Sequence, residues 1–94
     1  MSPIDSARIA ERRQRLQAID QDIIGLIRQH QEVVLQLRTL RRLAGLREFQ
    51  LAQENEVLSQ YHEALGGTGT AIALRLLSPT PPGAAGERVA PNAA

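Results

Sequence analysis

The sequence predicts an all-α protein built from three helices, one very long, one medium and one short. Three observations lead to this fold class. Residues 3–42 contain no proline after Pro3 and only one glycine, Gly25. Apolar side chains recur through that stretch at alternating steps of three and four residues, the spacing of a helix that packs against other helices. Gly45 and the pair Gly66-Gly67 then divide the following residues into two shorter helical segments.

The first predicted helix covers residues 3–42, with Ser2 suited to the N-cap and Pro3 to the first helical position. Its apolar seam consists of Leu16, Ile19, Ile23, Leu26, Val33, Leu37, Leu40 and Ala44. His30 is the one polar member of this series. At 1.5 Å per residue such a helix is about 60 Å long, more than a single small domain can cover.

We therefore expect an intertwined helical homodimer in which the long helices of two copies lie antiparallel. A plain coiled coil fits less well, because the seam spans one helix and the charges beside it show no regular pairing.

The second predicted helix covers residues 47–65, after Gly45 interrupts the apolar pattern. Its apolar stripe consists of Phe49, Ala52, Val57, Leu58, Tyr61 and Leu65. Gly66-Gly67 are predicted to supply a left-handed cap that ends it.

The third predicted helix covers residues 70–78 and is stopped by Pro79. These three helices form one predicted domain over residues 1–78. The following residues, 79–94, are rich in Pro, Ala and Gly, and we expect them to form a disordered tail.

Composition argues against several classes of function. The chain has no cysteine, and its two histidines, His30 and His62, lack the spacing of a metal site, so no metal is expected. A net charge of +1, one Tyr, one Phe and no Trp argue against nucleic-acid binding, which stays the weakest alternative. No apolar run is long enough for a membrane span and the N-terminus lacks the apolar core of a signal peptide. A cytoplasmic protein without a membrane partner is the expectation.

One segment of the first helix carries a resemblance to a known family. Its residues are Arg13, Leu16, Ile19-Asp20, Ile23-Ile24 and Leu26-Ile27. This segment resembles the opening of AroQ-type chorismate mutases, in which an Arg on the long first helix is followed seven residues later by Asp in an Ile/Leu-Asp pair. The resemblance covers roughly residues 7–78 and implies the intertwined all-α homodimer of that family.

Carried forward without a gap, the resemblance assigns the family's functional positions. Arg13 takes the position of the Arg contributed across the dimer, and His30 that of a second substrate-binding Arg. Arg41 takes the position of the cation that contacts the ether oxygen. On the second helix the family's Arg-Glu pair falls on Gln53 and Glu54. Gln50 takes the place of an acidic residue.

The stretch from Tyr61 to Leu77 resembles the short intracellular subclass, which has an abbreviated third helix. Enzymes of that subclass are activated by binding DAHP synthase. The resemblance therefore implies DAHP synthase as a partner.

The implied reaction is the rearrangement of chorismate to prephenate, which needs no cofactor and no nucleophile. The substrate is a dianion whose ether oxygen gains negative charge, so the enzyme must place cations where charge develops. The resemblance implies that Arg13 binds a carboxylate, that Arg41 contacts the ether oxygen, and that Glu54 holds the ring hydroxyl or donates to the ether oxygen.

Two positions depart from the family pattern. His30 lacks the guanidinium fork that matches a carboxylate, and Gln53 is uncharged. Their replacement of two arginines predicts weak activity on chorismate, or activity on a related dicarboxylate with less charge or a changed ring substituent. The alternative is a non-catalytic paralogue that regulates another shikimate-pathway enzyme.

Each of these residues also has an ordinary structural interpretation. His30 can be a structural histidine of the seam, and Arg41 can be a solvated residue favoured by the dipole at the end of a helix. Arg13 belongs to an arginine run, and Glu54 lies near Glu56 on a polar helix. The site therefore depends on the joint spacing of these residues.

Overall fold

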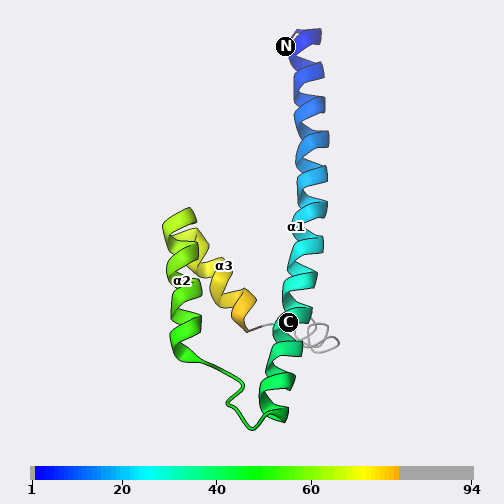
Figure 1. Ribbon diagram of the computed structural model, residues 1–94. Coiled ribbons are helices and arrows are strands. Elements are labelled where there is room, and N and C mark those ends of the chain that lie inside the picture. The colour runs from blue at the N-terminus through cyan, green and yellow to red at the C-terminus, as the bar shows by residue number, and fades with distance from the viewer. Residues whose placement is uncertain (1, 79–94) are drawn as a thin grey trace, which may run out of the picture. The chain divides into compact units, whose positions relative to one another are not determined.

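The computed structural model describes residues 2–78, and every regular element in that part of the chain is an α-helix (Figure 1). The helices are α1 (Pro3–Leu43), α2 (Leu51–Leu65) and α3 (Gly67–Leu77). The predicted all-α class and the predicted order of one very long, one medium and one short helix are thereby confirmed. The expected disorder of residues 79–94 lies outside the described residues. None of the described helices is both long enough and apolar enough to cross a membrane.

The start of α1 has the predicted cap. The Asp5 amide donates to the Ser2 hydroxyl at 3.2 Å, and that hydroxyl donates to the Asp5 carboxylate at 3.0 Å. Pro3 occupies the first helical position, where a missing N–H costs nothing because that group has no partner within the helix. These contacts fix where the 41-residue helix begins.

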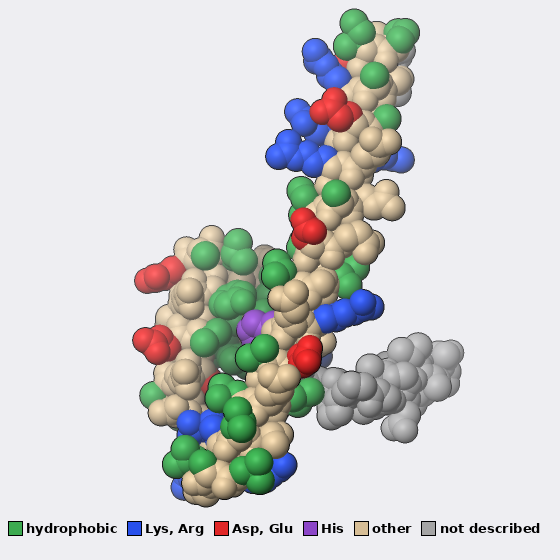
Figure 2. Space-filling view, turned by 45° about the vertical axis from the view of Figure 1, so that its right-hand side comes forward, with side chains coloured by type: hydrophobic (Ala, Val, Ile, Leu, Met, Phe, Trp, Pro, Cys, Tyr) green, Lys and Arg blue, Asp and Glu red, His purple; other side chains and the backbone are tan. Residues whose placement is uncertain are grey.

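The chain divides into two units, Met1–His30 and Gln31–Ala94, and each is described by itself. The first unit contains α1 as its sole described element, and none of its side chains there is buried. Its large apolar residues are instead exposed: Ile4, Ile9, Leu16, Ile19, Ile23, Ile24, Leu26 and Ile27. Figure 2 shows such hydrophobic side chains at the surface of α1.

In the second unit α1 ends in a Schellman motif. The Leu46 amide donates to the Arg41 carbonyl at 2.8 Å and the Gly45 amide to the Arg42 carbonyl at 3.0 Å. Gly45 has a φ of +75°, which favours glycine at this position.

The second helix begins four residues later than predicted. Residues 47–50 precede α2, and Gln50 is its N-cap with an extended backbone. Phe49 fitted the apolar spacing, but its ring lies under the Arg38 guanidinium, at 4.4 Å from the ring centroid. Phe49 therefore makes a tertiary contact with α1 and precedes α2, although its spacing had placed it within that helix.

The third helix begins three residues earlier than predicted. Gly66 has φ +68° and ψ −149°, so the predicted left-handed cap is wrong, although the positive φ is one that glycine adopts readily. Gly67 was expected in the cap but is the first residue of α3.

α2 and α3 pack side by side, as Figure 1 shows, and form the core of the second unit. Gly69, Ala73 and Leu76 are the buried residues of α3 and share one face. A Cβ at Gly69 would overlap the carbonyl oxygen of Tyr61 and lie 2.8 Å from the Leu65 Cβ. Glycine at this position therefore permits the close approach of the two helices.

Candidate functional site

The six predicted site residues fall in both units. Arg13 and His30 belong to the first unit, whereas Arg41, Gln50, Gln53 and Glu54 belong to the second. The geometry of each group is therefore described within its own unit.

Arg41 is held by the loop that follows α1. Its Nε donates to the Arg47 carbonyl at 2.7 Å, and its own carbonyl accepts from the Leu46 amide. Within residues 2–78 the two terminal nitrogens of this guanidinium have no hydrogen-bond partner. The side chain is partly buried. The bond from Nε thus orients Arg41, and the two terminal nitrogens of its guanidinium stay available for an anion.

Glu54 lies in the first turn of α2 and is partly buried. Together with Arg47, Glu48, Phe49 and Leu51 it lines a hollow of about 480 Å³. Its amide donates to the Gln50 carbonyl at 3.0 Å, which fixes Glu54 at the start of the helix.

Arg47 links these two candidates. Its carbonyl orients Arg41, and the same residue lines the hollow beside Glu54. In the second unit the candidate cation and the candidate carboxylate therefore each lie next to the loop residue Arg47.

Gln50 and Gln53 are exposed and are not among the residues that line this hollow. Gln50 acts through its backbone, whose carbonyl also accepts from the Gln53 amide at 3.1 Å. Its side chain makes no cap hydrogen bond.

Arg13 lies in a basic stretch of the first unit. Together with Arg8, Ile9, Arg12 and Leu16 it lines a shallow hollow of about 310 Å³ on α1. Figure 2 shows basic side chains gathered near the start of this helix. Side chains of this kind on one exposed helix attract anions without selecting among them.

His30 is partly buried, and its Nδ1 is shielded from solvent with no hydrogen-bond partner in the described residues. A shielded ring nitrogen without a partner costs free energy.

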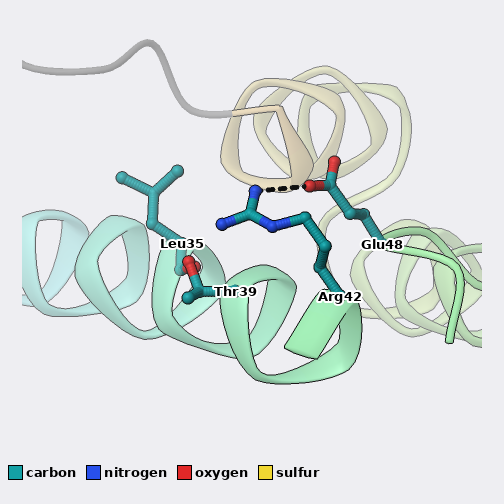
Figure 3. A network of polar contacts seen from close by, with 4 residues as sticks. All are labelled: Leu35, Thr39, Arg42 and Glu48. Atoms are coloured by element: carbon teal, nitrogen blue, oxygen red, sulfur yellow. Dashed lines mark hydrogen bonds and ion pairs between the residues drawn. The ribbon is translucent and has the colours of Figure 1, made fainter. Parts of the chain in front are cut away.

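Two further arginines of α1 make contacts that were not predicted from the sequence. Arg38 lies over the Phe49 ring and donates to the Leu77 carbonyl at the end of α3. Arg42 donates to the Glu48 carboxylate at 3.0 Å, as Figure 3 shows. The spacing of Arg38, Arg41 and Arg42 at i, i+3 and i+4 was the available signal, since it places them on one face of the helix.

Comparison with protein-family models, with curated proteins and with solved structures finds no match to this chain. A fixed guanidinium binds carboxylates or stabilises a developing negative charge, and a nearby carboxylate accepts hydrogen bonds from hydroxyl groups. No group of three potential metal ligands occurs among residues 2–78.

Proposed function

We propose that this chain is an AroQ-type, chorismate mutase-like protein that acts as a homodimer on chorismate or a close relative, with low or atypical activity. The observation that carries the proposal is the arrangement around Arg47. Arg41 is oriented by the Arg47 carbonyl, and Glu54 lines a hollow with the same residue. The helix order, long then medium then short, also supports the family assignment.

In the proposed reaction Arg41 stabilises the negative charge that develops on the ether oxygen as its bond to the ring breaks. Its role requires a charge held in place before the reaction, and the bond from Nε to Arg47 supplies that orientation. Glu54 holds the ring hydroxyl of the substrate. Arg13, contributed by the second copy, binds a carboxylate through its guanidinium fork.

The low activity follows from the two positions that lack the family's arginines. His30 and Gln53 offer hydrogen bonds but no guanidinium fork to the substrate carboxylates. A hydrogen bond to a charged group contributes about 1.5–3 kcal/mol, so two missing cations slow the reaction by orders of magnitude. A substrate with less negative charge would lose less stabilisation from the absence of these two cations.

The dimer is supported by the exposed apolar side chains of α1. Ile19, Ile23 and Leu26 are 44%, 47% and 63% exposed, although they lie on the seam predicted to contact another helix. Covering this surface by a second copy removes apolar area from water.

The alternative function is a non-catalytic, AroQ-type regulatory partner of another shikimate-pathway enzyme, with DAHP synthase as the candidate. The uncharged side chain of Gln53, which is exposed and does not line the hollow, favours this alternative.

The test is the loss of chorismate absorbance with the purified protein, compared among the parent, Arg41→Met and Arg28→Met. Arg28 is an exposed arginine of α1 and serves as the matched control. We expect slow turnover by the parent, unchanged turnover by the control, and a rate at least about tenfold lower for Arg41→Met. No turnover by the parent, together with retention by DAHP synthase in a pull-down, would establish the alternative.

A further inference from the structure

Arg38 joins three parts of the second unit. It belongs to α1, its guanidinium carbon lies 4.4 Å from the centroid of the Phe49 ring, and one of its terminal nitrogens donates to the Leu77 carbonyl. Phe49 belongs to the loop before α2, and Leu77 is the last residue of α3. One side chain thus contacts the loop and the end of α3 together.

Each of these contacts depends on the shape of the guanidinium. A planar cation can lie flat on an aromatic ring while its N–H groups donate in the same plane, which an ammonium group cannot do. The Leu77 carbonyl is also one of the unpaired acceptors at the C-terminal end of a helix, where a positive charge is favoured.

The loop that Arg38 contacts lies next to the candidate site residues Arg41 and Glu54. It contains Arg47, whose carbonyl orients Arg41, and Phe49 lines the same hollow as Glu54. A change in the position of Phe49 would therefore alter the hollow beside Glu54 and the attachment of Arg41.

We infer that Arg38 is a positioning residue that fixes the α1–α2 loop and the C-terminal end of α3 to α1, and so keeps Arg41 and Glu54 in place. The structural part of this inference depends on the contacts of Arg38 alone. Its catalytic consequence rests on the proposed function.

The test compares amide hydrogen exchange in the full chain among the parent, Arg38→Met, Arg38→Lys, Phe49→Leu and the matched control Arg28→Met. Exchange reports local opening of the loop and of the last turn of α3, independently of any activity. Circular dichroism checks that each variant keeps its helices.

We expect both Arg38 variants to speed exchange at Gly45, at Leu46 and at the last turn of α3 by about tenfold, given the strength of the two contacts. Phe49→Leu removes the ring and keeps the donation to Leu77, so it should affect the loop but not α3. Arg28→Met should affect neither region.

Two exchange results would overturn the inference. One is an Arg38→Lys protein that keeps the protection of the parent, because charge alone would then suffice. The other is an Arg38→Met protein that matches Arg28→Met, or whose exchange rises equally in all helices.

Steady-state rates test the catalytic consequence. We expect Arg38→Met to lower kcat about tenfold with little change in KM, as for a loss of alignment. An unchanged kcat in a variant whose loop exchanges faster would refute the positioning role. If the parent does not turn over chorismate, the proposed function fails, and exchange alone still decides whether Arg38 fixes the loop.

Discussion

Along the first unit, from Pro3 to His30, no side chain of α1 is buried, whereas in the second unit Gly69, Ala73 and Leu76 are buried against α2. The polar contacts differ in the same way. Most of the hydrogen bonds that join separate elements lie in the second unit, among them Arg38 to Leu77 and His62 to Thr70. The second unit therefore has packing of its own.

The first unit shows what helical periodicity provides without a packed neighbour. Its helix is capped at Ser2, but helices in proteins owe most of their stability to packing of an apolar face. Exposed isoleucines and leucines at helical spacing are the surface for such packing. Substitutions at Ile19 and Gly25 test whether a second copy supplies this packing. Substitutions at His30 with Gln53, and at Gly69, test the candidate site and the core of the second unit.

The largest effect is expected for Ile19→Glu in the first unit. If a second copy covers Ile19, the substitution buries an unpaired carboxylate twice in each dimer, at about 3–5 kcal/mol per site. We expect the parent to sediment as a dimer and the variant as a monomer with reduced helix content. Gln21→Glu, which adds the same charge at an exposed polar position of α1, should remain dimeric. A compact monomer for the parent would contradict the prediction.

The second prediction uses one residue from each unit. His30→Arg combined with Gln53→Arg should raise kcat/KM for chorismate, because each guanidinium can pair with a substrate carboxylate for about 1.5–3 kcal/mol. The protein should also melt at a lower temperature, since an arginine on the seam is a partly buried charge without substrate.

The control adds the same charges elsewhere, as Gln29→Arg with Gln60→Arg, both at exposed positions. If the His30/Gln53 double variant stays folded and dimeric but turns over chorismate no faster than the parent, missing cations are not the cause of low activity. The regulatory alternative would then become the better proposal.

The third prediction concerns the core of the second unit. Gly69→Ala should destabilise the protein by about 1–3 kcal/mol, because the added methyl group overlaps Tyr61 and crowds Leu65. Gly67→Ala is the matched control, since a Cβ there meets nothing within 4 Å. Thermal unfolding should show a lower Tm for the first variant and an equal or higher Tm for the second. Equal Tm values for the two variants would mean that α3 does not lie this close to α2 in solution.

The smallest effect is expected for Gly25→Ala in the first unit. A Cβ at Gly25 meets nothing within 4 Å, so alanine should stabilise the helix by about 0.5–1 kcal/mol. The measurement is the midpoint of urea unfolding at fixed protein concentration. A lower midpoint would indicate that another chain approaches α1 closely at this position.

Much of the fold could be predicted because its signals are local. The cap at Ser2, the proline-free stretch and Gly45 fix the ends of α1. The predicted start of α2 was wrong because Phe49 fits the spacing of a helical apolar stripe, whereas its ring contacts Arg38 of α1. The predicted start of α3 was wrong because Gly66-Gly67 were assigned to a cap, whereas Gly67 is the first residue of α3.

The candidate site could be predicted less completely. The family resemblance proposed Arg41 and Glu54, and the structure places each of them next to the loop residue Arg47. Spacing places Arg38 on one face of α1 with Arg41 and Arg42, but it could not indicate what Arg38 contacts, because the acceptor is a backbone carbonyl 39 residues away. Nor could it indicate that Gln50 and Gln53 are exposed beside the hollow.

The connection between α2 and α3 consists of one residue, Gly66. With so short a link, the rotation of α3 about its axis is set covalently by the end of α2. Inserting a single residue after Gly66 would turn the register of α3 by about 100°, the angle per residue of a helix. Gly69, Ala73 and Leu76 would then leave the face that contacts α2, and bulkier side chains would replace them. We therefore expect the surface of α3 to tolerate many substitutions. The junction between α2 and α3 should tolerate no change in length.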